Sequence, residues 1–295
     1  MKKYTCFTHY DLDGVVSYIT LRWALGPFDS VQQSTARRFR EDYTKWLINN
    51  NPDDYDKIYI TDLDVSEHKD LIDRDNVFII DHHKSHEENA GYKKATAVVK
   101  EYKSAAELIY KVFRKLNNLE LTQEQKKLIL YTSDYDSYEL QLSESVKLNS
   151  IFWHTNKGFD SFVKHFSKGF YGYTVEQESI YKFYKEVIDR VREQLSVYSG
   201  TFKIQGKERI VCAAFADKNI NEVADFLLKD FNAEVALVVN TKGNHVSLRR
   251  PKTGSDVDVS LLSAKLCNGA GHEYAAGGEI TEKFLQFTKL LKQVK

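Results

Sequence analysis

The 295-residue sequence has few of the residues that mark fibrous, disordered or disulfide-bonded chains. It holds 3 prolines and 14 glycines, which excludes a collagen-like or linker-like protein. Its 3 cysteines, Cys6, Cys212 and Cys267, form no CxxC pair, so we expect neither a disulfide framework nor a thiolate zinc site. Cys6 and Cys212 lie in apolar, strand-like runs. We therefore interpret the cysteines as free thiols, with these two buried in the core.

The sequence also lacks an excess of either charge and any long hydrophobic run. Its 42 Lys and Arg residues balance 42 Asp and Glu residues, so no basic field favours long, non-specific binding of nucleic acid. A polyanion would have to be bound locally. No 18 consecutive residues are apolar, and acidic residues follow the N-terminus before a signal-like stretch forms. We expect a cytoplasmic protein that does not contact a membrane.

The length predicts two domains, and hydrophobic residues, at 42%, are sufficient for a sizeable core. In the first half, short apolar runs alternate with helical patterns, which favours an α/β fold with a parallel sheet. A long amphipathic pattern predicts a connecting helix over 174–199 that stops at Gly200. A smaller α/β domain is expected after it. The predicted domains are 1–185 and 200–295. The predicted strands cover 4–8, 57–61, 77–80, 210–215, 235–240 and 245–249, and the other predicted helices cover 104–118, a segment from Thr122, and 221–231.

Acidic and histidine residues follow three predicted strands of the first half. They are His9, Asp11 and Asp13; Asp62 and Asp64; and Asp81, His82, His83 and His86. The carboxyl ends of parallel strands meet at one edge of a sheet, so these side chains are expected to converge. Carboxylates and imidazoles without thiolates suit Mn²⁺, Mg²⁺ or Zn²⁺. A pair of such ions, about 3.5–4 Å apart, clamps a phosphoryl group and activates a water molecule.

Each of these residues also has a plainer structural interpretation. An aspartate after a strand is often a helix N-cap, and a DHH triplet can be a solvated turn. We prefer that interpretation for Asp64, Asp136 and His86. For Asp11, Asp13, Asp62 and His82, the interpretation as helix caps or solvated turns would have to be true at three strand ends at once. We therefore prefer metal ligation for these four residues. One further ligand is expected from Asp134 or Asp136, and we prefer Asp134 because it directly follows an apolar run.

Five separated motifs resemble those of the DHH phosphoesterase superfamily with its DHHA1 domain, which includes RecJ-type exonucleases, nanoRNases and family II pyrophosphatases. HYDLDG, ITDLD, DHH and SDYD resemble its four successive N-terminal motifs, and NGAGHEYAAGG resembles the glycine loop of DHHA1. The resemblance implies two Mn²⁺ ions, with Mg²⁺ as an alternative. It implies that Asp81 orients the imidazoles and that His83 faces the scissile phosphate. The implied ligands are His9, Asp11 and Asp62 for one ion, and Asp13, Asp62, His82 and Asp134 for the other.

The second domain is expected to bind the substrate. Gly269 and Gly271 allow backbone N–H groups to approach a phosphate, His272 adds a donor, and Arg249 can make a bidentate contact. We expect a Mn²⁺-dependent phosphodiesterase or exonuclease that hydrolyses short oligonucleotides, similar to nanoRNases. The alternatives are a RecJ-like single-strand DNA exonuclease, a hydrolase of cyclic dinucleotides or of 3′-phosphoadenosine 5′-phosphate, and a catalytically silent nucleotide-binding module. A homodimer is compatible with the sequence.

Overall fold

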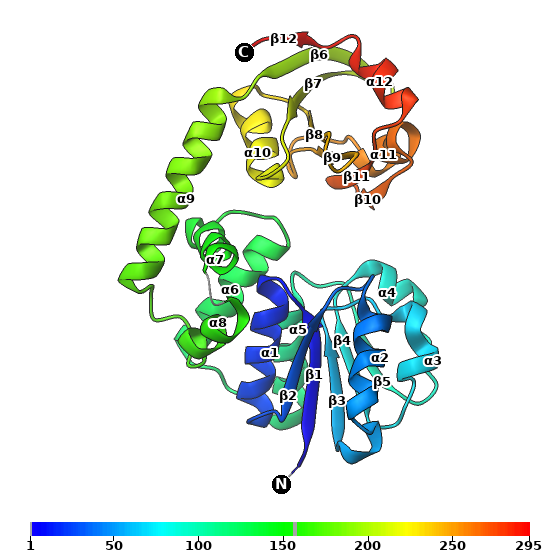
Figure 1. The fold of residues 1–295 in the computed structure, drawn as a ribbon, viewed down its shortest axis with the longest axis vertical. Coiled ribbons are helices and arrows are strands. Elements are labelled where there is room, and N and C mark those ends of the chain that lie inside the picture. The colour runs from blue at the N-terminus through cyan, green and yellow to red at the C-terminus, as the bar shows by residue number, and fades with distance from the viewer. Residues whose placement is uncertain (1, 156–157) are drawn as a thin grey trace. The chain divides into compact units, whose positions relative to one another are not determined.

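The computed structural model describes residues 2–155 and 158–295, and the chain forms two compact units, 1–182 and 183–295 (Figure 1). Each unit has its own β-sheet with a separate hydrophobic core on each face. No helix among these residues is long and apolar enough to cross a membrane.

The first unit is built on a five-stranded sheet in which all neighbouring strands are parallel, in the order β2-β1-β3-β4-β5. The predicted α/β fold with a parallel sheet is confirmed. The central strands β1, β3 and β4 are buried apolar runs, as strands covered on both faces must be. The strands are β1 (Tyr4–His9), β2 (Ser30–Ser34), β3 (Lys57–Thr61), β4 (Val77–Asp81) and β5 (Thr96–Val99).

Helices cover both faces of this sheet (Figure 1). On one face α1 (Leu12–Leu25) and α5 (Ala105–Asn117) pack together, and α6 (Gln123–Asp136), α7 (Ser143–His154) and α8 (Gly158–Phe166) extend that core. On the other face lie α2 (Phe39–Asn49), α3 (Lys69–Ile72) and the short α4 (Lys84–Asn89). The Thr122 side chain and Gln125 form a capping box, which explains why α6 begins where the sequence predicts.

The second unit contains a seven-stranded mixed sheet, in the order β10-β11-β9-β8-β7-β6-β12. β7 and β8 are parallel, and the other neighbours are antiparallel. One face packs against α10 (Ile220–Asp230), and the other against α11 (Val259–Cys267) and α12 (Glu282–Thr288). The strands are β6 (Val197–Ile204), β7 (Lys207–Phe215), β8 (Val235–Asn240), β9 (His245–Arg249), β10 (Ala270–His272), β11 (Ala275–Glu279) and β12 (Lys292–Gln293).

The predicted connecting helix is present but shorter than expected. It is α9 (Val175–Gln194), whereas the sequence predicts a helix as far as Ser199. Residues 197–204 instead form β6, which pairs with β7 along its whole length. The prediction was wrong because Leu195 and Tyr198 continue the helical stripe, while the buried side chains of Val197, Phe202 and Ile204 pack into the cores of the second unit.

Candidate metal centre

The order of strands places the acidic motifs at one point of the sheet edge. β1 lies between β2 and β3, so the chain leaves β1 towards β2 on one side and continues through β3 and β4 on the other. Such a reversal opens a crevice at the carboxyl ends of the strands, where ligands bind in open α/β sheets. His9 ends β1, Asp62 follows β3, and Asp81 ends β4. Three segments distant in sequence therefore meet at the edge of the sheet where the order of the strands reverses.

The HYDLDG motif forms the turn from β1 into α1. The Asp11 carboxylate caps α1 by accepting a hydrogen bond from the Gly14 amide at 3.0 Å. A Cβ atom on Gly14 would lie 2.0 Å from the His9 carbonyl oxygen, so only glycine fits here. Asp13 is buried in the first turn of α1, and its carboxylate accepts hydrogen bonds from the amides of Ala105 and Ala106 at the start of α5.

Asp62 lies at the centre of the site. Its side chain is 3% exposed, and its backbone adopts the left-handed conformation, with φ at 55°. One carboxylate oxygen, Oδ1, is 3.2 Å from His82 Nε2, and the other, Oδ2, is 4.0 Å from His9 Nδ1. Within the described residues, Oδ2 is buried and has no hydrogen-bond partner. A buried carboxylate oxygen without a donor is expected where a cation binds.

The carboxylates and imidazoles form three overlapping groups whose potential ligand atoms lie within 4.8 Å of one another. No lysine or arginine in the described ranges forms an ion pair with their carboxylates. These oxygen and imidazole donors, whose negative charge is balanced by no lysine or arginine of the described residues, fit a site for divalent cations. The groups are His9, Asp11 and Asp62; Asp13, His82 and Asp136; and Asp62, Asp81, His82 and His83.

The pKa shifts reflect this crowding of negative charge. Burial raises the pKa of Asp62 well above its usual range, and the charges of Asp13 and Asp11 raise it further. Burial, followed by the charge of Asp13, likewise raises the pKa of Asp136. Burial acts to lower the pKa of His82, but the charges of Asp13 and Asp136 outweigh it and the pKa is raised. A divalent cation would favour the ionised carboxylates and the neutral imidazole.

The structure brings together the predicted residues of the three strand ends, but it replaces Asp134 with Asp136. Asp136 Oδ2 lies 3.4 Å from His82 Nε2. The Asp134 carboxylate instead accepts hydrogen bonds from the amides of Gln141 and Leu142, at 3.0 and 3.1 Å, and from Ser145 Oγ at 2.5 Å. The preference for Asp134 is therefore corrected: Asp134 holds the loop that leads into α7.

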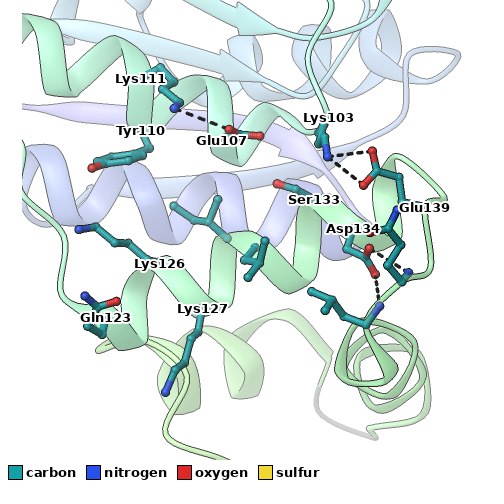
Figure 2. Close-up of a pocket in the computed structure, with 14 residues that line it drawn as sticks. Lys103, Glu107, Tyr110, Lys111, Gln123, Lys126, Lys127, Ser133, Asp134 and Glu139 are labelled. Carbon is teal, nitrogen blue, oxygen red and sulfur yellow. Dashed lines mark hydrogen bonds and ion pairs between the residues drawn. The ribbon is translucent and has the colours of Figure 1, made fainter.

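Figure 2 shows the surroundings of Asp134. It borders a cavity of about 580 Å³ between α5 and α6, whose rim includes the Lys103–Glu139 ion pair, and none of the three candidate ligand groups lines this cavity. Asp136 is two positions further along the same helix, which rotates its side chain by about 200° towards the strand ends. The solvated turn that the sequence predicts at Asp136 is absent, because α6 continues through this residue.

Asp81 is enclosed by two histidines. Its Oδ1 bonds to His83 Nδ1 at 2.8 Å, and its Oδ2 to His86 Nδ1 at 2.7 Å. Burial acts to raise the pKa of Asp81, but these hydrogen bonds outweigh it and hold the pKa below its usual range. His86 was expected to lie in a solvated turn, yet it is fully buried and its Nε2 bonds to the Tyr92 hydroxyl at 2.7 Å. Asp64, in agreement with its structural interpretation, bonds to Ser66 and Ser85.

The predicted substrate-binding residues of the second unit lie around β9, β10 and β11. The Arg249 guanidinium donates to the carbonyls of Leu248 and Ala276 and to Asn221 Oδ1. Gly269 is required by packing, since a Cβ atom there would lie 2.1 Å from the Gly277 carbonyl oxygen. Gly271 lies in β10, paired with Ala276 of β11. His272 ends β10, but its side chain lies outside the described part of the structure.

Two protein-family models match this chain, one in each unit of the structure. The DHH family, N-terminal domain, matches residues 3–133, and the DHHA1 domain matches residues 209–295. No curated protein sequence matches the chain significantly.

Among solved structures, the pGpG-specific phosphodiesterase PggH from Vibrio cholerae is 13% identical with a TM-score of 0.62, and the match covers 97% of this chain and 96% of PggH. An exopolyphosphatase-related protein from Bacteroides fragilis is 15% identical with a TM-score of 0.55, over 98% and 91% of the two chains. RecJ from Thermus thermophilus, in complex with Mn²⁺, is 13% identical with a TM-score of 0.52, over 98% of this chain and 51% of RecJ.

At these identities the structural matches show a shared fold. The two family matches occur in order, on the two units of the structure, and the first contains the strand ends that carry His9, Asp62 and His82. The chain belongs to the DHH/DHHA1 phosphoesterase superfamily and is a phosphoester hydrolase.

Proposed function

We propose that the protein is a Mn²⁺-dependent phosphodiesterase that hydrolyses short oligonucleotides, dinucleotides included. The observation that carries this proposal is the cluster around Asp62, where buried and half-buried carboxylates and imidazoles from three strand ends surround an oxygen without a described donor. Mn²⁺ matches such a mixed set of oxygen and nitrogen ligands. The RecJ structure of the same fold contains Mn²⁺, which supports the choice of ion.

The geometry supports one assignment of ligands. His9 and Asp11 would hold one ion, Asp13, His82 and Asp136 would hold the other, and Asp62 would bridge the two. When bound, the ions would supply Lewis-acid stabilisation of the phosphoryl oxygens and lower the pKa of a water nucleophile.

The surrounding side chains orient these ligands. His82 Nδ1 bonds to the Tyr102 carbonyl oxygen at 3.1 Å, which leaves Nε2 as the ligand atom. The bond of His83 Nδ1 to Asp81 turns its Nε2 away from that carboxylate. The His83 side chain is 40% exposed, so Nε2 is accessible for a hydrogen bond to the scissile phosphate. Asp81 is therefore a positioning residue, and His83 would contact the substrate.

The length of the substrate is inferred from three observations. The chain has no net positive charge to hold a long polyanion. PggH, named for the linear dinucleotide pGpG, matches over nearly its whole length, whereas the chain spans about half of RecJ. We propose that residues 1–185 carry the metal site and that residues 200–295 bind the nucleotide through Arg249, Gly269, Gly271 and His272.

A substrate panel with Mn²⁺ tests the proposal. It should contain RNA and DNA from two to about twenty nucleotides with 5′ or 3′ labels, a cyclic dinucleotide, and 3′-phosphoadenosine 5′-phosphate. We expect the highest kcat/KM for the shortest linear oligonucleotides. Asp62→Asn should abolish hydrolysis, and Asp64→Asn, two residues further along the chain and hydrogen-bonded to Ser66 and Ser85, is the matched control. Full activity of Asp62→Asn, or a preference for long strands, would contradict the proposal.

A further inference from the structure

Two large aromatic side chains are exposed beside the candidate metal centre. Tyr10, in the turn between β1 and α1, is 43% exposed, and Trp153, in the last turn of α7, is 48% exposed. Their ring centroids are 5.6 Å apart, at an interplanar angle of 81°. The two rings therefore form a corner in which the edge of one meets the face of the other.

This corner is continuous with the metal centre. The Tyr10 ring lies 4.9 Å from the ring of His9, whose Nδ1 is 2.7 Å from the Asp11 carboxylate. The rings of His9, Tyr10 and Trp153 are thus in successive contact, and His9 is itself a candidate ligand. A nucleoside whose phosphate is bound at the ligands would lie close to the Tyr10 ring.

Packing within the unit does not account for the exposure of Trp153. The preceding residue, Phe152, is 6% exposed and belongs to the core, where it meets Phe162 at 5.3 Å. Trp153 contacts Phe152 and Tyr10 through ring edges, but about half of its surface is left in solvent. An exposed aromatic pair at the edge of a polar site is suited to a flat, apolar-faced ligand.

We propose that Tyr10 and Trp153 form a stacking surface for a nucleobase of the substrate, next to the phosphate that is hydrolysed. The inference rests on the proposed function, and it adds a base-recognition site within the first unit. Stacking on an aromatic ring tolerates any base, because every base has a π-face. The surface would therefore favour nucleotides over other phosphodiesters without selecting a sequence.

Hydrolysis of paired substrates tests the surface. An intact dinucleotide is compared with the same dinucleotide lacking one base, with Mn²⁺ present. Removal of one stacking ring typically weakens binding by about 5- to 150-fold. Trp153→Leu and Tyr10→Leu should each lower the intact-to-abasic ratio of kcat/KM by about that factor, mainly through KM. Trp153→Phe and Tyr10→Phe keep a π-face and should retain most of the wild-type ratio of kcat/KM. Tyr171→Leu, at a residue 73% exposed and outside the site, is the matched control.

Tryptophan fluorescence gives a readout that does not depend on turnover. The other tryptophans, Trp23 and Trp46, are partly or fully buried in the cores, so Trp153 should dominate quenching by a bound base. A phosphorothioate-linked dinucleotide should quench the wild type, and Trp153→Phe should abolish that change.

Each outcome separates the two proposals. If the wild type hydrolyses no nucleotide, the proposed function fails, while quenching by the dinucleotide would still support a stacking surface. If the wild type hydrolyses dinucleotides but the leucine variants lose equally on both substrates, the stacking surface is refuted and the function stands. A dimer in the wild type that both leucine variants convert to a monomer, with an unchanged substrate ratio, would assign the aromatic pair to a contact between copies instead.

Discussion

Asp134 and Asp136 are separated by one residue, and the structure gives their carboxylates different partners. Asp134 accepts three hydrogen bonds from the loop and helix that follow it, whereas Asp136 faces His82 and Asp13. Replacing each with asparagine changes the charge while keeping the shape. We expect Asp134→Asn to lower stability and keep the metal affinity, and Asp136→Asn to do the reverse.

The expected magnitudes follow from these contacts. The Asp134 side chain belongs to a residue that is 5% exposed, and an asparagine amide group would face at least one of its three donors. A buried donor left unpaired lowers the free energy of unfolding by about 1–3 kcal/mol. A loss of about 2 kcal/mol lowers the Tm of a unit of this size by roughly 4–8 °C. Asp136→Asn removes one of several crowded negative charges, so the metal-free protein should be equally or more stable. Its affinity for one Mn²⁺ ion should fall about 100-fold.

Thermal unfolding of the metal-free proteins and calorimetric titration with Mn²⁺ measure the two effects. The first unit is followed separately by the fluorescence of its tryptophans, because all three lie within residues 1–182. If Asp134→Asn weakens Mn²⁺ binding as much as Asp136→Asn does, the distinction drawn from the hydrogen bonds is refuted. A destabilised Asp136→Asn with normal Mn²⁺ affinity would refute it equally.

Three further predictions concern the turn, the pH dependence and the thiols. Gly14→Ala should reduce Mn²⁺ affinity about 10-fold or more, because its Cβ would overlap the His9 carbonyl; unchanged binding in a calorimetric titration would contradict this. Because the pKa values of Asp62 and Asp136 are raised, the metal-free protein has a contribution to its stability that is present at low pH and is lost as the pH rises through those pKa values. Mn²⁺ should therefore raise the Tm more at pH 8 than at pH 5. Equal increases at the two pH values would contradict the assignment of these ligands. Burial raises the pKa of Cys6 to about 12 and the other two thiols are buried, so a thiol reagent at pH 8 should label none in the native protein and 3 in urea; rapid native labelling would refute this.

The central strands could be predicted from the sequence because strands covered on both faces are short apolar runs that end at polar residues. This holds for β1, β3 and β4, whose ends carry the candidate ligands. It does not hold for β2, whose sequence SVQQS is polar because it lies at the edge of the sheet and is largely only half-buried. The site could be found without β2, since none of its residues belongs to the three ligand groups.

Two site residues depended on information that local sequence does not contain. The choice between Asp134 and Asp136 required the exact end of α6, and element ends are set by tertiary contacts such as the loop held by Asp134. The burial of His86 required knowing that α4 folds back onto Asp81. His86, the third residue after the DHH triplet, was a signal in the sequence, because a histidine one helical turn after His83 can reach the same carboxylate.

The backbone at Asp62 bears on whether this chain is a silent descendant of a hydrolase. A left-handed residue with a buried, uncompensated carboxylate is costly in the metal-free protein, and asparagine or glycine would relieve both the charge and the conformation. The stability of the metal-free fold therefore does not favour an aspartate at position 62. The proposed metal site accounts for this residue, because a bound cation would compensate the buried carboxylate, whereas a catalytically silent module would leave it without an explanation.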